Sequence, residues 1–163
     1  MFLTFRRTQI SDMNIIKPPH PLEVNQVSIF LAGSIELDKA ELWQDRVCEA
    51  LADLSVTILN PRRDSWDASW PQEISFAPFR EQVEWELEAL ELTDMILMYF
   101  DPATKSPISL LELGLYARSK KMVVCCPKGF WRKGNVDIVC VRYGIEQVER
   151  LEDLIDWVKG QLS

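Results

Sequence analysis

The sequence has no apolar run approaching the ~20 residues that a membrane-spanning helix needs. Its amino end, Met1 to Arg7, lacks the apolar core and cleavage site of a secretory signal. We therefore expect a cytoplasmic protein without a membrane partner. The net charge of −7 also leaves no excess of basic residues for a nucleic-acid polymer, whose phosphates require a basic face.

Residues that bind metals or cofactors are scarce. The chain has one histidine, and its four cysteines form no C-x-x-C pair, so we predict no metal site. Glycine-rich dinucleotide and P-loop motifs are absent, and we expect no cofactor. Cys125, Cys126 and Cys140 lie in apolar runs, which is typical of buried free thiols. A single nucleotide remains possible, because hydroxyls and backbone N–H groups can hold its phosphate.

Strand-like and helix-like segments alternate through most of the chain. Residues 1–25 contain three prolines and predict an irregular or partly extended arm, so the domain should span 26–163. The pattern predicts strands at 27–32, 56–60, 94–100, 122–126 and 138–142. It predicts helices at 38–54 (starting at Asp38), 79–92, 107–120 and 146–161. Such alternation indicates an α/β fold, a five-stranded parallel sheet covered by helices on both faces.

Ligands of such sheets bind beyond the carboxyl ends of the strands. Gly33 and Ser34 follow the first predicted strand, where they could approach a phosphate or sugar or simply form a turn. The long connection at 61–78 carries Trp66 and Trp70, either of which could stack on a base. Ser106 could cap the next helix, contact a phosphate, or do both.

Glu112 is the most unusual residue, because leucines and a glycine surround it. Burying a carboxylate costs several kcal/mol without compensation, so such a residue has either a partner or a function. It could equally be a surface residue at the rim of a core-facing stripe. Glu86 and Asp94 are further acidic candidates, with a solvated helix face and a strand edge as their ordinary explanations.

Three segments together resemble the nucleoside 2-deoxyribosyltransferase family, whose superfamily includes nucleotide N-glycosidases. They are IFLAGSI at 29–35, TDMILMYF at 93–100 and LELGLYA at 111–117, and the resemblance covers roughly residues 27–126. It implies a flavodoxin-like or Rossmann-like three-layer sandwich that assembles as a homodimer or larger homo-oligomer. Its small-molecule partner would be a nucleoside or nucleotide.

The resemblance also implies roles for single residues. Glu112 matches the nucleophile and Glu86 a second carboxylate that contacts base or sugar, although the family more often has Asp there. Asp94 matches the aspartate that opens a strand. The transferases carry Asp where this chain has Ser106, whereas the nucleotide hydrolases have Ser, which contacts the 5′-phosphate. Asn135 is a candidate for the contact made by a neighbouring subunit.

These residues predict cleavage of an N-glycosidic bond through a covalent glycosyl-Glu112 intermediate. Gly33, Ser34 and Ser106 would contact the sugar-phosphate side. Ser109 and Tyr116, three residues before and four after Glu112, are expected to hydrogen-bond its carboxylate. Two alternatives stay open: a transferase that exchanges bases, and a nucleotide-binding module without turnover.

Overall fold

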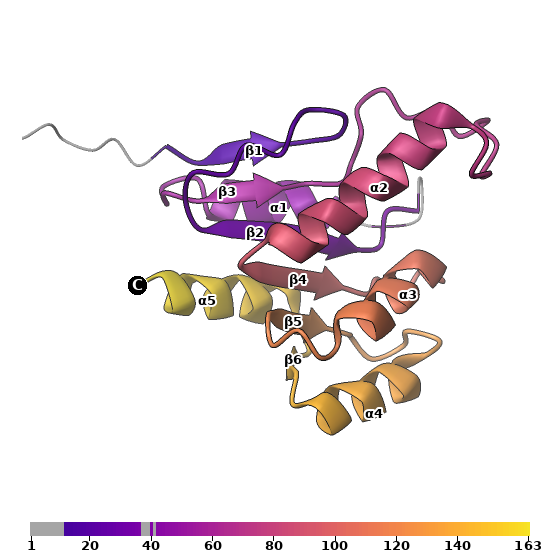
Figure 1. Cartoon of the computed structure of the whole chain (residues 1–163). Helices are drawn as coiled ribbons and strands as arrows, with labels where there is room; N and C mark the ends of the chain where they lie inside the picture. The colour runs from indigo at the N-terminus through magenta and orange to yellow at the C-terminus, as the bar shows by residue number, and fades with distance from the viewer. Residues whose placement is uncertain (1–11, 37–39, 41) are drawn as a thin grey trace, which may run out of the picture.

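The computed structural model describes residues 12–36, 40 and 42–163. Within them, six strands form one parallel sheet in the order β1-β3-β2-β4-β5-β6 (Figure 1). The strands are β1 (Asn14–Ile16), β2 (Ser28–Gly33), β3 (Thr57–Leu59), β4 (Met95–Tyr99), β5 (Met122–Cys125) and β6 (Glu146–Val148). The helices are α1 (Trp43–Ala50), α2 (Ala77–Leu92), α3 (Pro107–Tyr116), α4 (Lys133–Tyr143) and α5 (Leu151–Leu162).

Helices cover both faces of the sheet, which makes the three-layer, Rossmann-like sandwich that the sequence predicts (Figure 1). The apolar core on one face packs the sheet against α2, α3 and α4, through residues such as Trp85, Leu113 and Cys140. The core on the other face packs it against α1 and α5, through Trp43 and Leu154. No helix of the described residues is long and apolar enough to cross a membrane.

The predicted strand at 138–142 is wrong, because this segment belongs to α4. Its β-branched residues suggest a strand, but burial follows the helical period. Val136 and Cys140, four residues apart, are at most 1% exposed, whereas Ile138 is 71% and Val141 82% exposed. A helix presents positions i and i+4 to the same side, while a strand would alternate. Gly144, in the left-handed conformation, ends the helix.

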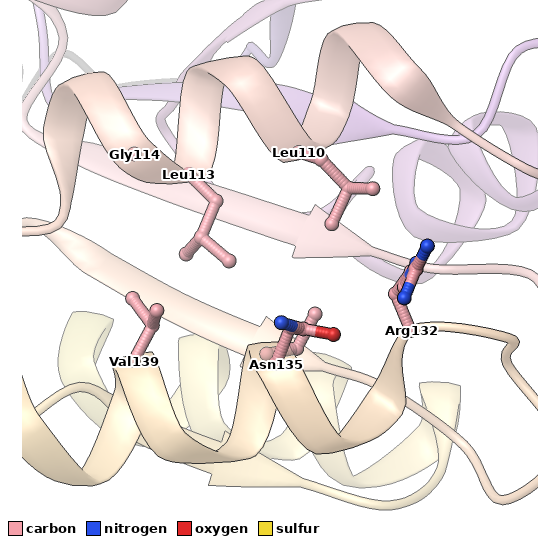
Figure 2. A pocket seen from close by; sticks show the side chains of 7 residues that line it. Leu110, Leu113, Gly114, Arg132, Asn135 and Val139 are labelled. Atoms are coloured by element: carbon pink, nitrogen blue, oxygen red, sulfur yellow. The ribbon is translucent and has the colours of Figure 1, made fainter.

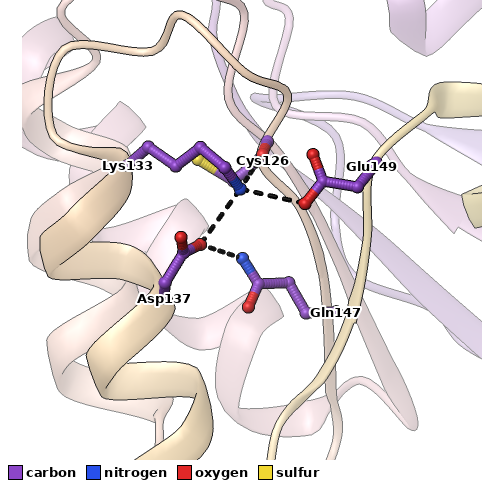
Figure 3. Close-up of polar contacts among 5 residues, drawn as sticks. All are labelled: Cys126, Lys133, Asp137, Gln147 and Glu149. Carbon is purple, nitrogen blue, oxygen red and sulfur yellow. Dashed lines mark hydrogen bonds and ion pairs between the residues drawn. The ribbon is translucent and has the colours of Figure 1, made fainter.

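The sixth strand, β6, replaces the missing one and is linked to α4 by Lys133 (Figure 3). The Lys133 ammonium donates to the Cys126 carbonyl at 2.8 Å, to Asp137 at 3.1 Å and to Glu149 at 3.0 Å. Gln147 of β6 donates to the same Asp137 carboxylate. Helix α4 begins at Lys133, before the predicted strand, and the predicted helix at 146–161 is observed only after β6, as α5.

Part of the predicted irregular or partly extended arm forms a strand of the sheet. β1 adds a parallel edge strand, with Asn14 opposite Thr57 and Ile16 opposite Leu59 of β3. The sheet therefore has six strands rather than five, and the folded domain includes residues before 26. The predicted helix at 38–54 is observed as the shorter α1, and its predicted start, Asp38, lies outside the described residues.

The strand order of the sheet reverses direction between β2 and β4, which makes this position the topological switch point. From β2 the chain first moves outward to β3 and then returns to the other side of β2 as β4. Loops that leave the carboxyl ends of β2 and β4 therefore diverge there, which is where ligands of such sheets bind. Gly33 makes this junction possible: its φ is +134°, and a Cβ atom at this position would lie 2.2 Å from the Tyr99 carbonyl oxygen.

Replacing Gly33 by alanine should therefore destabilise the fold. The added methyl group meets backbone that cannot yield, and the positive φ strains any L side chain, so we expect a loss of ~2 kcal/mol or more in unfolding free energy. Urea unfolding measures it. Gly160→Ala is the control, because its Cβ meets nothing within 4 Å, and it should be neutral or stabilising by up to ~1 kcal/mol. Equal stability of the two variants would contradict this account.

Candidate functional site

Three buried hydroxyls join the ends of β2 and β4. The Ser34 hydroxyl lies 2.9 Å from that of Thr104 and 2.6 Å from that of Ser106, and these two are 2.7 Å apart. All three residues are at most 5% exposed. Ser34 also accepts the Asp101 N–H, and Thr104 donates to the Asp101 carbonyl, both at 2.9 Å. The cluster fixes the start of α3 against the end of β2.

The hydroxyls of Ser34 and Ser106 are engaged in hydrogen bonds within the protein. Their hydroxyls bond to each other, so contact with a sugar or phosphate would require rearrangement. Ser106 stands at the predicted cap position of α3, but in the left-handed conformation with φ 47°. Its hydroxyl bonds to Ser34 and Thr104 rather than to the N–H groups of the helix, so the predicted side-chain cap is wrong.

Glu36 instead interacts with the amino end of α3. Its Oε1 accepts the backbone N–H groups of Lys105 and Ser106, each at 2.8 Å. A helix amino end carries a partial positive charge and attracts anions. The carboxylate thus reaches across from the segment after β2 and supplies the negative charge there.

Glu112 and Glu86 lie on neighbouring helices, α3 and α2. Glu112 is only 8% exposed. Its side of α3 faces α2, because the Tyr116 hydroxyl, one turn further along, donates to the Leu87 carbonyl of α2 at 3.3 Å. Gln82 donates to Glu86 at 2.6 Å and to the Pro61 carbonyl at 2.9 Å. No ion pair joins either glutamate to a cation within the described part of the chain.

Burial raises the pKa values of both carboxyl groups. Loss of hydration raises the pKa of Glu112 to about 8, and the charge of Glu86 adds to this shift. Burial raises the pKa of Glu86 to about 7, against the opposing effect of the Gln82 hydrogen bond. Acids with pKa values raised toward neutrality can donate and accept protons near neutral pH, as acid–base catalysis requires.

Within the described residues, neither Ser109 nor Tyr116 hydrogen-bonds to the Glu112 carboxylate as expected. Ser109 is buried on the same side of α3, three residues before Glu112. The Tyr116 hydroxyl donates to the Leu87 carbonyl instead of the carboxylate. Burial raises the pKa of Tyr116, and the charges of Glu91 and Glu112 raise it further. Tyr116 therefore connects the two helices that carry the glutamates.

Asp94 lies far from these groups. Its Oδ2 accepts the Ser28 backbone N–H at 2.8 Å and the Ser28 hydroxyl at 3.1 Å, at the amino end of β2. Gly33 lies five residue steps along β2 from Ser28, which is about 16 Å at ~3.3 Å per step. Asp94 therefore anchors the amino end of β2, at the opposite end of the strand from Gly33, and the structure does not bring it to the candidate site.

Trp66 belongs to the connection between β3 and α2. Its ring packs edge-on against Trp70 with 5.1 Å between centroids, and Trp70 also contacts Phe76 at 5.9 Å. The Arg63 guanidinium lies 5.2 Å from the centre of the Trp70 ring. The long connection thus has a small aromatic core of its own. This packing orders the loop without placing Trp66 against either glutamate.

Asn135 faces a hollow of about 310 Å³ between α3 and α4 (Figure 2). Leucine and valine side chains form its walls, and Arg132 lies at one end. The α3 residues that line it, including Leu110 and Leu113, do not include Glu112, which faces α2. Asn135 and Glu112 therefore lie on different sides of α3 within one chain.

Sequence reasoning missed Thr104, Glu36 and Gln82. Thr104 and Glu36 make their contacts with residues about 70 positions away, and no local pattern indicates such pairs. Gln82 is 5% exposed and its Oε1 has no hydrogen-bond partner within the described residues. Its position one turn before Glu86 was the only available signal.

The architecture, with the buried Glu112 and the partly buried Glu86 on neighbouring helices, defines a three-layer α/β protein with a candidate acid–base site. Residues 26–130 match the nucleoside 2-deoxyribosyltransferase-like family, so the chain belongs to this family. The family consists of nucleoside-processing enzymes, which supports an enzyme that acts on a nucleoside-type small molecule.

Comparison with solved structures supports the fold. The crystal structure of a conserved protein from Enterococcus faecalis V583 resembles this chain with a TM-score of 0.56 at 15% sequence identity. The similarity covers 85% of this chain and 100% of that chain. No curated protein sequence matches this chain.

The raised pKa of Glu112 predicts a pH-dependent stability. Between its ordinary value of 4.5 and about 8, the folded chain retains a proton that the unfolded chain has released. This contribution is complete below pH 4.5 and is lost as the pH rises through about 8. Glu112→Gln should therefore gain stability over the wild type as pH rises, by at least ~1 kcal/mol at pH 8.

Urea unfolding from pH 4.5 to pH 9 tests this expectation. Glu49→Gln is the control, since Glu49 is exposed on α1, on the other face of the sheet. Its difference from the wild type should change little over the same range. A difference between Glu112→Gln and wild type that stays constant with pH would show that Glu112 is not a perturbed acid.

Proposed function

We propose that this protein cleaves the N-glycosidic bond of a nucleoside or nucleoside 5′-monophosphate, with Glu112 as nucleophile. The observation that carries this proposal is the pair of glutamates on facing helices, Glu112 buried and Glu86 partly buried, without a cation partner in the described residues. Buried carboxylates are costly and are normally paired with cations. Their presence inside the segment that matches a nucleoside-processing family supports a catalytic use.

The reaction would proceed in two steps. Glu112, ionised, attacks the anomeric carbon C1′; the C1′–N bond breaks and its electron pair leaves with the base. Glu86, protonated, donates its proton to the departing base. Glu86 then accepts a proton from water, which attacks C1′ and releases Glu112. Because the pKa of Glu112, about 8, lies above that of Glu86, about 7, the reaction requires the proton to pass from Glu112 to Glu86 when the substrate binds. The positive charge that develops on the sugar stabilises the ionised form of Glu112 and so favours this transfer.

Other residues would then position the sugar and the base. Gly33, Ser34 and Ser106 stand at the switch point, and Ser109 lies on the α3 surface between Ser106 and Glu112. We assign these residues to the sugar and its 5′ end. Trp66 is the proposed contact for the base, which requires it to separate from Trp70 or to present its open face.

Base exchange is the second candidate, favoured by the family to which the chain belongs. In that reaction a second base, rather than water, captures the sugar from Glu112. Incubating a deoxynucleoside with a different free base separates the two. A new nucleoside indicates transfer, whereas free sugar or sugar phosphate indicates hydrolysis.

Glu112→Gln should lower base release by at least ~10³-fold, because the amide cannot form the glycosyl ester. Chromatography of free base from a panel of nucleosides and their 5′-monophosphates measures it. Glu86→Gln should also be impaired, since no acid then protonates the base. Glu88→Gln, an exposed change on the same helix as Glu86, is the matched control. Wild-type rates in Glu112→Gln would exclude the nucleophile assignment.

We also infer that the protein forms a homo-oligomer through α3 and α4. Five large apolar side chains, each more than half exposed, form what we call the α3–α4 face: Ile108, Leu111, Leu115, Ile138 and Val141. They belong to α3 and α4, the two helices whose other residues line the hollow of Figure 2. Together they expose several hundred Å², much of the ~800 Å² that each partner buries in a standard interface.

A second copy of the chain suits this face because exposed apolar side chains and an apolar hollow belong to the same two helices. In a two-fold dimer the same patch meets itself, so side chains such as Ile138 of one copy can enter the hollow of the other. Arg132 and Asn135, which line that hollow, would then lie at the interface. This arrangement supports the proposed role of Asn135 as a contact between subunits.

The double variant Ile138→Glu with Val141→Glu should dissociate the oligomer, because the interface would bury new charges. Sedimentation equilibrium measures the mass. Ile74→Glu, at a residue 80% exposed in the loop before α2, is the control and should leave the mass unchanged. A wild-type monomer at micromolar concentration, or an unchanged mass in the double variant, would contradict the proposed interface.

A further inference from the structure

The amino end of α3 is built to hold an anion. Ser106 adopts a left-handed conformation (φ 47°, ψ 53°), which is uncommon for a residue other than glycine. This conformation turns successive backbone N–H groups toward one point, a concave arrangement that binds anions. The N–H groups of Lys105 and Ser106 both donate to one atom, Oε1 of Glu36, at 2.8 Å. The chain thus provides both the anion site and its occupant.

Two cations stand close to this site. The Lys105 ammonium lies 4.5 Å from the centre of the Trp131 ring, and the Arg132 guanidinium lies 4.4 Å from it. Trp131 itself donates to the Lys105 carbonyl at 2.9 Å, which fixes it beside the start of α3. The positive surroundings favour an anion at the Glu36 position.

The site is at the right distance from Glu112 to receive the 5′ end of a nucleoside. Ser106 and Glu112 are six residues apart on one helix, which is an axial rise of about 9 Å at 1.5 Å per residue. A sugar whose anomeric carbon contacts the Glu112 carboxylate would direct its far end toward the start of α3. The 5′ substituent therefore meets either the free N–H groups or the carboxylate that occupies them.

We propose that Glu36 is a specificity residue that makes the site accept a free 5′-hydroxyl and reject a 5′-phosphate. The inference rests on the proposed function, because it concerns the same substrate. The Glu36 carboxylate already accepts the N–H groups that a phosphate would need, and its second oxygen is the acceptor for a 5′-hydroxyl. A phosphate at this position would meet a like charge, which costs several kcal/mol.

This proposal differs from the expectation that Ser106 contacts a 5′-phosphate. The resemblance links a serine at this position with a phosphorylated substrate. Here the Ser106 hydroxyl is occupied by Ser34 and Thr104, and its N–H by Glu36. The identity of residue 36, rather than that of residue 106, then decides which substrates bind.

Glu36→Gln is the decisive variant, because the amide oxygen can still accept both N–H groups while the negative charge is removed. Binding is measured by calorimetry with 2′-deoxynucleosides, their 5′-monophosphates and inorganic phosphate, on wild type and variant. The wild type should bind each nucleoside more tightly than its monophosphate. Glu36→Gln should increase the monophosphate-to-nucleoside affinity ratio at least ~10-fold. Glu49→Gln, which removes the same charge on the other face of the sheet, should leave the ratio unchanged.

Three results would overturn the proposal. They are a wild type that prefers monophosphates, an unchanged ratio in Glu36→Gln, and a variant that binds neither phosphate nor monophosphates at millimolar concentration. A purely structural role would lower the unfolding free energy of Glu36→Gln without changing the ratio. Binding without base release would refute the proposed reaction but not the role of Glu36, because the affinity ratio does not depend on turnover.

Discussion

The close contact between the carboxyl end of β2 and β4 is the constraint on which the site depends. Only glycine fits at position 33, where the backbone passes against the Tyr99 carbonyl. Directly after it, the Ser34 N–H donates to the same carbonyl at 3.0 Å, and the Ser34 hydroxyl joins Thr104 and Ser106. The first turn of α3 is thereby fixed to the sheet. The position of Glu112, less than two turns later, follows from that attachment.

The sequence predicted the elements whose local pattern agrees with their place in the fold. The central strands β2, β4 and β5 are continuous apolar runs because helices cover both faces. The segment at 138–142 was misread, because its β-branched residues favour a strand while its contacts with the sheet are those of a helix. Tertiary packing, through Val136 and Cys140, outweighs that local preference. The edge strand β1 escaped prediction because it has only three residues, two of them exposed.

The candidate site was predictable where its chemistry is concentrated in one residue type and not where it depends on distant pairs. Glu112 could be identified because a carboxylate among leucines is costly. Asp94 has an equally unusual place in the sequence, yet it bonds to Ser28 at the amino end of β2. The hydrogen bonds of Glu36 join residues about 70 positions apart, which depend on the whole sheet. No single-sequence pattern contains that information.

The two glutamates that we propose for catalysis weaken the folded state. Glu112 is buried and Glu86 partly buried, both without cation partners in the described chain, and their raised pKa values mean that ionisation opposes folding. At the amino end of α3 the opposite holds, because Glu36 places a negative charge where the helix favours one. In the proposed function, Glu112 contacts C1′ and Glu36 the 5′ end of one substrate. Helix α3 fixes the separation of the two carboxylates, so a substrate that binds in this way must match both at once.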